Sequence, residues 1–199
     1  PAQRDRDGVG GRSGALTPAA GEGDADAADR SARRRALKPE PLIAALVEGG
    51  IEFIVVGGFA VAAHGYPRAT KDIDICPNPT TENLARLADV LAALDAEPIG
   101  LGDLGGEFEL RPDREGLSGG GNRTLATRHG RLDVMQHLAG LGDEGGGWAE
   151  LRRHAVKRSF LGYDCLFCGY SDLIRLKRAS GRPQDAIDIE NLKAARSEL

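Results

Sequence analysis

The chain has 199 residues, of which 41% are hydrophobic and 28% are charged, a composition typical of globular proteins. No apolar run approaches the ~20 residues that a membrane-spanning helix needs, the N-terminal part lacks a signal-peptide core, and three cysteines are too few for a disulfide framework. We therefore expect a cytoplasmic protein that has no membrane partner. The formal net charge of −4 excludes a strong overall attraction to nucleic acid, so any such contact must be local.

Residues 1–36 are dominated by glycine, alanine, aspartate, arginine and serine, with few large aliphatic side chains. Such a segment cannot bury enough apolar surface to offset the entropy cost of ordering its backbone. We therefore expect a disordered tail over residues 1–36 and a folded region over residues 37–199. The arginine run at 33–35 could contact phosphate, but a solvated tail of mixed charge is the favoured interpretation.

A buried strand and a short helix are predicted around a glycine pair. Residues 53–56 (Phe-Ile-Val-Val) are apolar and mostly β-branched, which favours a strand, and residues 39–48 before them have the apolar spacing of a helix. Gly57 and Gly58 follow the strand, and residues 59–64 are compatible with a helix. The pair would lie at a helix N-terminus, where free N–H groups and the helix dipole attract phosphate and the missing Cβ atoms let it approach. It is a candidate triphosphate-binding turn.

Two acids are expected on one face of the next strand, which reads Asp72-Ile73-Asp74-Ile75. Because successive strand side chains point to opposite faces, Asp72 and Asp74 share one face and the two isoleucines share the other. The acids would lie roughly 6.6 Å apart along the strand, at about 3.3 Å per residue. That spacing lets both carboxylates reach shared divalent metal ions.

The later elements are predicted from turn signals and apolar periodicity. Helices are expected over 84–94, 148–154, 171–180 and after Pro183, and strands over 124–127, 131–135, 155–160 and 163–167. Ser171 is expected to cap its helix and Gly181 to end it. Pro77 and Pro79 should end the pairing of the acidic strand. The glycine-rich segment 100–121, with a candidate strand at 108–110, is expected to form a loop near the substrate.

Taken together, the strand, glycine pair, helix and acidic strand resemble the DNA polymerase beta-type nucleotidyltransferase superfamily. The signature is a hydrophobic residue, Gly and Gly or Ser, a spacer, and Asp-hydrophobic-Asp/Glu-hydrophobic; here it is Val56-Gly57-Gly58, a long spacer over 59–71, and residues 72–75. The resemblance implies an α/β (α+β) fold, in which a small mixed β-sheet is flanked by helices, with further helices at the C-terminus. It also implies transfer of a nucleoside monophosphate (NMP) group from an NTP to an acceptor hydroxyl, with Mg²⁺ or Mn²⁺ as cofactor.

By this resemblance Asp72 and Asp74 ligate the metal that is shared with the triphosphate, and Gly57 and Gly58 bind the triphosphate. Asp133 lies on the strand where the superfamily has its third metal-binding carboxylate, and there it would also help to deprotonate the acceptor hydroxyl. A lone acid at an exposed strand position would have the same sequence pattern, so a structural role is the alternative for Asp133.

A second motif lies near the C-terminus, where Lys177, Arg182 and Asp185 flank a break between two helices. The order of these residues is similar to the C-terminal motif of AbiEii-type nucleotidyltransferase toxins. By that resemblance Lys177 neutralises triphosphate charge and Asp185 orients Lys177 or Arg182. Arg68 and Thr70, which precede the acidic strand, complete the predicted nucleotide-binding residues. The alternative is a charged amphipathic helix pair without a catalytic role.

The resemblance to AbiEii-type toxins favours RNA, such as tRNA, as the acceptor and an antitoxin as a partner. Local cations that could contact an RNA backbone are Arg152, Arg153, Lys157, Arg158, Arg175, Lys177 and Arg178. A transferase that modifies a small molecule or a protein is an alternative. An antitoxin-type enzyme is less favoured, because Phe59 follows the glycine pair where such members have Gly-Ser and an Arg-rich spacer. A non-catalytic nucleotide-binding module of the same fold is the remaining alternative.

Two other patterns in the sequence are predicted to be structural. Cys165 and Cys168 have C-x-x-C spacing, but no second pair or nearby histidines complete a zinc site, so we expect buried thiols. His64 ends the helix that follows the glycine pair, and we expect it to be a packing or capping residue.

Overall fold

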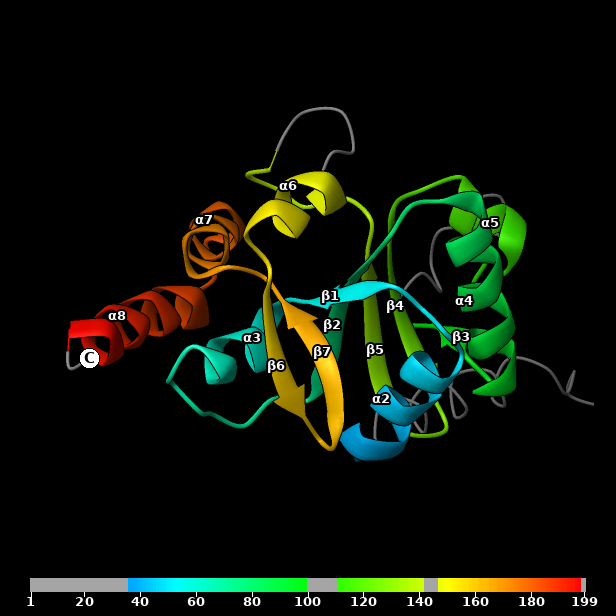
Figure 1. The fold of residues 1–199 in the computed structure, drawn as a ribbon, viewed down its shortest axis with the longest axis horizontal. Coiled ribbons are helices and arrows are strands. Elements are labelled where there is room, and N and C mark those ends of the chain that lie inside the picture. Colours follow the sequence, from blue (N-terminus) through cyan, green and yellow to red (C-terminus); the bar gives the residue numbers. More distant parts are fainter. Residues whose placement is uncertain (1–35, 100–110, 142–146, 198–199) are drawn as a thin grey trace, which may run out of the picture.

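The structure is a computed structural model that describes residues 36–99, 111–141 and 147–197. These residues form a mixed seven-stranded sheet in the order β3-β4-β5-β2-β1-β7-β6 (Figure 1). The strands are β1 Phe53–Val55, β2 Asp72–Pro77, β3 Glu97–Pro98, β4 Asn122–Thr127, β5 Gly130–Met135, β6 Val156–Phe160 and β7 Tyr163–Phe167. The helices are α2 Pro39–Glu48, α3 Gly57–Ala63, α4 Thr81–Ala93, α5 Arg114–Ser118, α6 Gly147–His154, α7 Tyr170–Ser180 and α8 Pro183–Ser197.

Strand pairing brings distant parts of the sequence together at the centre of the sheet. β2 is antiparallel to β1 on one side and parallel to β5 on the other. In the register of β2 with β5, Asp74 lies opposite Asp133 and Asp72 lies opposite Arg131. Because paired residues in a sheet point to the same face, four charged side chains gather on one face of two adjacent strands.

The other face of β2 belongs to the hydrophobic core, because Ile73 and Ile75 are fully buried while Asp72 and Asp74 are partly exposed. Figure 1 shows α4 and α5 at one end of the molecule and α7 and α8 at the other. Helix α3 contacts both β2 and α7. The acidic face of β2 therefore lies at the α7 and α8 end.

The predicted fold class is confirmed, and the predicted helices and strands are present with shifted ends. Helix α3 begins at Gly57, so the glycine pair forms the first turn of the helix and not a linker before it. The α7 N-cap is Gly169, so the predicted cap at Ser171 is wrong, whereas Gly181 caps the C-terminus in the left-handed conformation as predicted. Strand β2 continues to Pro77 because pairing with β5 ends at Ile75, which leaves the proline beside β1 alone.

Two short elements were not predicted, namely β3 and α5. Strand β3 contains a proline, and α5 is too short for apolar periodicity to reveal it. The predicted tail, apart from Ala36, and the candidate strand at 108–110 lie outside the described residues.

The thiols and His64 lie in the structure as the sequence indicates. Cys76, Cys165 and Cys168 are buried free thiols, and burial raises the pKa of Cys76 and Cys168 to about 12. The ring of His64 donates from Nε2 to the Cys168 carbonyl oxygen at 2.8 Å, so it has a structural partner. Among the described residues, no helix has the length and hydropathy needed to cross a bilayer.

Candidate active site

The glycine pair brings the start of α3 directly against the acidic strand. Gly57 has a φ of +60°, and a Cβ atom built there would lie 1.9 Å from Oδ2 of Asp74. A Cβ atom on Gly58 would lie 2.8 Å from Oγ1 of Thr70. The backbone N–H of Gly58 hydrogen-bonds the Asp74 carboxylate. The absence of side chains at both positions is therefore required for this close approach.

The acids of β2 and β5 are electrostatically coupled. Burial, followed by repulsion from Asp72 and Asp133, raises the pKa of Asp74 to about 6. The Gly58 N–H and the positive charge of Lys177 oppose that rise. Asp74 thus lies in a region where negative charge is only partly compensated, and where a cation would be stabilised.

Two neighbouring side chains hold the other acids in place. The hydroxyl of Thr70 donates to Oδ1 of Asp72 at 3.1 Å. Arg131 makes a bidentate pair with Asp133, with Nε at 3.0 Å from Oδ1 and Nη2 at 2.8 Å from Oδ2. Nε of Arg131 also lies 3.6 Å from Oδ2 of Asp72. Arg131 therefore links the acids of the two strands, and both oxygens of Asp133 are engaged.

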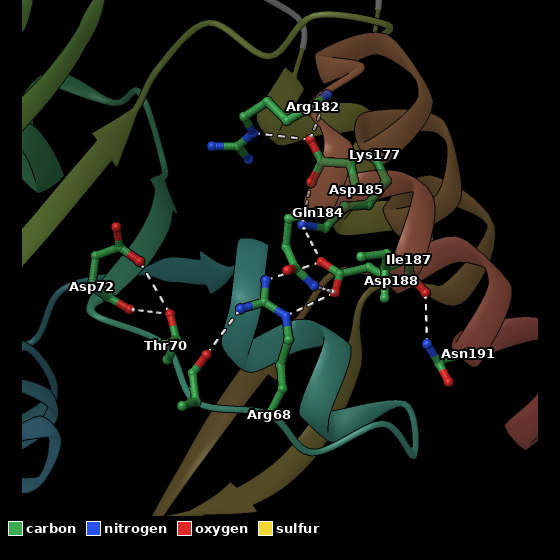
Figure 2. A network of polar contacts seen from close by, with 11 residues as sticks. Arg68, Thr70, Asp72, Lys177, Arg182, Gln184, Asp185, Ile187, Asp188 and Asn191 are labelled. Atoms are coloured by element: carbon green, nitrogen blue, oxygen red, sulfur yellow. Dashed lines mark hydrogen bonds and ion pairs between the residues drawn. The ribbon is translucent and has the colours of Figure 1, made fainter.

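A buried charge network joins the C-terminal helices to the loop before β2 (Figure 2). Lys177 is only 4% exposed, and its Nζ lies 2.7 Å from Oδ1 of Asp185 and 2.8 Å from Oδ2 of Asp188. The guanidinium of Arg68 binds the fully buried Asp188 through Nε at 2.8 Å and Nη2 at 2.9 Å. Figure 2 shows Arg68 reaching from its loop to α8. This network fixes the helices α7 and α8 relative to the acidic strand.

Asp185 has a second partner in Arg182, whose Nε lies 2.9 Å from Oδ2. Burial alone would raise the pKa of Asp185, but hydrogen bonds from Arg182, Lys177 and Ser180 outweigh it and lower the pKa to about 2. Burial would also raise the pKa of Asp188, but hydrogen bonds from Arg68, Lys177 and Gln184 outweigh it and lower that pKa. Both acids are therefore ionised at neutral pH. Both acids are buried, and Arg182 and Asp185 form an i,i+3 pair of the kind that the alternative, a charged helix pair, also predicts.

The site has two adjoining cavities, which we call the polar cavity and the aliphatic cavity. The polar cavity encloses about 270 Å³. Its charged and glycine lining residues are Gly57, Gly58, Arg68, Lys71, Asp72, Asp74, Lys177, Arg182 and Asp185, together with Thr70 and Gln184. Every predicted site residue except Asp133 thus lines one cavity. Asp133 lies beside it on β5, bound to Arg131.

The aliphatic cavity encloses about 210 Å³ and has Gly57, Asp74, Lys177 and Arg182 in common with the polar cavity. Most of its remaining lining comes from Val56, Met135, Leu138, Ala139, Leu173 and Leu176, with Asn122, His137 and Ser180 as polar members. Asp74 therefore stands between a cavity lined by charges and a cavity lined by aliphatic side chains.

Four residues of the site were not predicted from the sequence. Lys71 and Gln184 line the polar cavity, Asp188 anchors Lys177, and Arg131 binds Asp133. The strand period could have identified Arg131, because it is two residues before Asp133 on a predicted strand. Helical spacing likewise places Asp188 on the same face as Asp185. Lys71 carries no comparable signal.

No protein-family model matches the sequence, and no curated protein matches it significantly. The structure is similar to that of the lincosamide antibiotic adenylyltransferase LnuA in its lincomycin-bound crystal form, with a TM-score of 0.53 and 16% sequence identity over 81% of this chain and 99% of that chain. The chain has a nucleotidyltransferase fold. It also matches a protein from Thermotoga maritima that is assigned as a nucleotidyltransferase, with a TM-score of 0.48 and 14% identity over 83% and 98% of the two chains.

Proposed function

We propose that the protein transfers an NMP group from an NTP to an acceptor hydroxyl in a reaction that depends on a divalent metal ion. The observation that carries this proposal is the close approach of the Gly57 turn to Asp74, within a cavity that also holds Asp72 and several cations. A polyphosphate needs both features, because cations neutralise its charge and carboxylates bind the metal ions that accompany it. The nucleotidyltransferase fold supports the same reaction class.

The metal would be held by Asp72 and Asp74, with Mg²⁺ or Mn²⁺ as the expected ion. Among the described residues, no group of three or more His, Cys, Asp or Glu side chains is arranged to bind a metal ion. Asp72 and Asp74 nevertheless fit a divalent cation, because they are oxygen ligands on one strand face, and because burial, followed by repulsion from Asp72, raises the pKa of Asp74. Asp133 would join them only if Arg131 released it. When bound, the metal would stabilise negative charge on the reacting phosphate.

Other residues of the site would bind the triphosphate or hold the acids and helices in position. Arg182 and Lys71 are exposed cations at the polar cavity and would contact the triphosphate. Lys177 would act mainly through its charge, since its ammonium is buried and paired with two aspartates. Thr70 would hold Asp72, and Arg68 would fix its loop to α8. Because Asp74 borders both cavities, transfer would take place beside its carboxylate.

The acceptor hypothesis from sequence is RNA, and it depends on a group of cations on α6, β6 and α7. Several of these cations are neutralised in the structure. Lys157 pairs with Asp164, Arg175 pairs with Glu150, and Lys177 pairs with the two buried aspartates. The exposed cations Arg152, Arg153, Arg158 and Arg178 are spread over three elements. An RNA backbone would therefore find fewer available charges than the sequence indicates.

The proposed reaction can be tested with each α-³²P-labelled NTP, Mg²⁺ or Mn²⁺, and three acceptor pools: total RNA, total protein, and a low-mass fraction that contains lincomycin. Lincomycin is included because the matched structure of LnuA contains it. We expect metal-dependent label in one pool. Asp74→Asn should abolish it, whereas Asp89→Asn, at an exposed acid on α4, should not. Equal labelling by the two variants would refute the proposed role of Asp74.

A further inference from the structure

We propose that the aliphatic cavity is the acceptor site, and that the acceptor is a small molecule with an aliphatic body and a hydroxyl group. The inference depends on the proposed NMP transfer for the identity of the reaction, but the binding of such a molecule can be measured without it. Nucleotide transfer needs two binding sites that meet at the reacting phosphate. The polar cavity suits the nucleotide, which leaves the adjoining cavity for the acceptor.

Continuity of the two cavities is the first support. Gly57, Asp74, Lys177 and Arg182 line both of them, so a molecule in the aliphatic cavity would have one end beside the carboxylate of Asp74. A hydroxyl group at that end would face the nucleotide. The rest of the molecule would extend away from the charged wall and toward β5 and α7.

The chemistry of the lining is the second support. Met135 and Leu138, at and after the end of β5, line the cavity together with Leu173 and Leu176 of α7. Leu173 is fully buried and Leu138 is 5% exposed, so this wall belongs to the core and is held in place by it. Burying an apolar ligand against apolar surface of this kind is favourable, by roughly 25 cal/mol for each Å² of apolar surface removed from water.

The polar residues of the cavity are mostly committed to the protein. Asn122 accepts from the His137 backbone N–H at 2.8 Å and donates to the His137 carbonyl oxygen at 2.8 Å, so it braces the segment after β5. Ser180 hydrogen-bonds Asp185. Apart from the exposed imidazole of His137, polar recognition of the ligand is therefore concentrated at the shared wall near Asp74, which fits a molecule with one main polar end.

An RNA 3′ end fits this cavity less well. Unpaired bases are bound by stacking on aromatic or guanidinium planes, with cations along the backbone. The described lining has no Phe, Tyr or Trp, and its only ring is that of His137. Its ammonium group, on Lys177, is buried and paired with Asp185 and Asp188, which leaves the guanidinium of Arg182, bound to Asp185 through Nε, as the one exposed cation of the described lining. The observations therefore favour a small aliphatic acceptor over a nucleic acid.

The proposed acceptor site can be tested by a substitution at the rim of the aliphatic cavity that places a bulky side chain in it. Ala139 lines it and is exposed, so Ala139→Phe adds a phenyl ring without burying new volume in the core. The matched control is Ala92→Phe, at an exposed alanine on α4. Binding of 4-(trifluoromethyl)cyclohexanol is measured by ¹⁹F NMR, binding of an RNA oligonucleotide ending in CCA by fluorescence anisotropy, and binding of mant-ATP and mant-GTP with Mg²⁺ by fluorescence.

We expect the alcohol to bind the wild type and the control equally, and to bind Ala139→Phe at least about fivefold more weakly, because the ring occupies its place. Nucleotide binding should be the same in all three proteins. Equal alcohol binding by Ala139→Phe, no alcohol binding by the wild type, or RNA binding that Ala139→Phe abolishes would each overturn the inference. If the wild type bound neither nucleotide, the proposed function would be refuted, and the alcohol measurement would still test whether the aliphatic cavity binds such a molecule.

Discussion

The sharpest prediction concerns Gly57, because two separate penalties meet at this position. Its φ of +60° is a left-handed conformation, which costs an alanine roughly 1–2 kcal/mol. In addition, the new Cβ would lie 1.9 Å from Oδ2, 2.5 Å from Cγ and 2.9 Å from Cβ of Asp74. Because real Cβ atoms do not come within 3.0 Å of such neighbours, the Asp74 side chain or the α3 turn must move. Gly57→Ala should therefore displace the carboxylate on which the proposed chemistry depends.

Gly50 provides a control that isolates the second penalty. Its φ is +66°, nearly the same as that of Gly57, but a Cβ there would meet only Nε of Arg86, at 4.0 Å. Urea unfolding should show that both variants lose about 1–2 kcal/mol from the backbone conformation, with a further loss in Gly57→Ala from the displaced side chain.

The functional assay for this pair is Mn²⁺ binding, measured by EPR, together with label transfer from the α-³²P-NTP. Gly50→Ala should keep both activities at the wild-type level under conditions where it is folded. Gly57→Ala should lose at least about tenfold in Mn²⁺ affinity, the equivalent of roughly 1.4 kcal/mol, because Asp74 no longer lies beside Asp72. If Gly57→Ala bound Mn²⁺ as well as Gly50→Ala does, Gly57 would not be required to position Asp74 for metal binding.

Three further predictions follow from the charges of the site. Lys177→Met should lower the free energy of unfolding by about 3–5 kcal/mol, because it leaves two buried aspartates without their shared cation. The control Lys157→Met removes one partner of an exposed ion pair and should lower the free energy of unfolding by at most about 1 kcal/mol in the same urea experiment. Arg131→Ala should strengthen Mn²⁺ binding about fivefold in EPR titrations, since it removes a positive charge and frees a carboxylate; unchanged or weaker binding would count against a metal at these acids. Burial, followed by repulsion from Asp72, raises the pKa of Asp74 to about 6. The contribution of this carboxyl group to the free energy of unfolding is therefore present in full below 3.8, its pKa in the unfolded chain, and is lost as the pH rises through about 6. Asp74→Asn should thus be more stable than the wild type at about pH 7.5 but equally stable at about pH 3.5, and a constant difference at both pH values would contradict the raised pKa.

Local sequence rules determined the central unit of this protein. Alternation along β2 predicted that Asp72 and Asp74 share a face, and the structure agrees, with Ile73 and Ile75 in the core. The left-handed cap at Gly181 follows from glycine's tolerance of positive φ. These features depend on residues a few positions apart, so periodicity and backbone preference are sufficient to predict them.

The partners of the charged residues could not be predicted in this way. Arg68 lines the polar cavity, where a nucleotide contact was predicted, but the sequence did not reveal that its guanidinium is bound by Asp188, far along the chain on α8. Lys177 was expected to be available to phosphate, and it is buried between two aspartates. From the sequence alone, an arginine or a lysine is equally compatible with binding a phosphate of a ligand and with pairing to a carboxylate of the same protein. Only the packing of α7 and α8 against the loop before β2 decides between them.

The amino-acid sequence alone thus determined the strand, glycine turn and paired acids that make a nucleotidyltransferase fold recognisable, because that pattern is local and each residue type is required by its own backbone position. Tertiary structure decided that Asp133 faces Asp74 with Arg131 as its partner, and that an aliphatic cavity adjoins the charged one. Those features arise where β2, β5 and α7 come together, and strand register and helix packing over long sequence separations are set by the whole core.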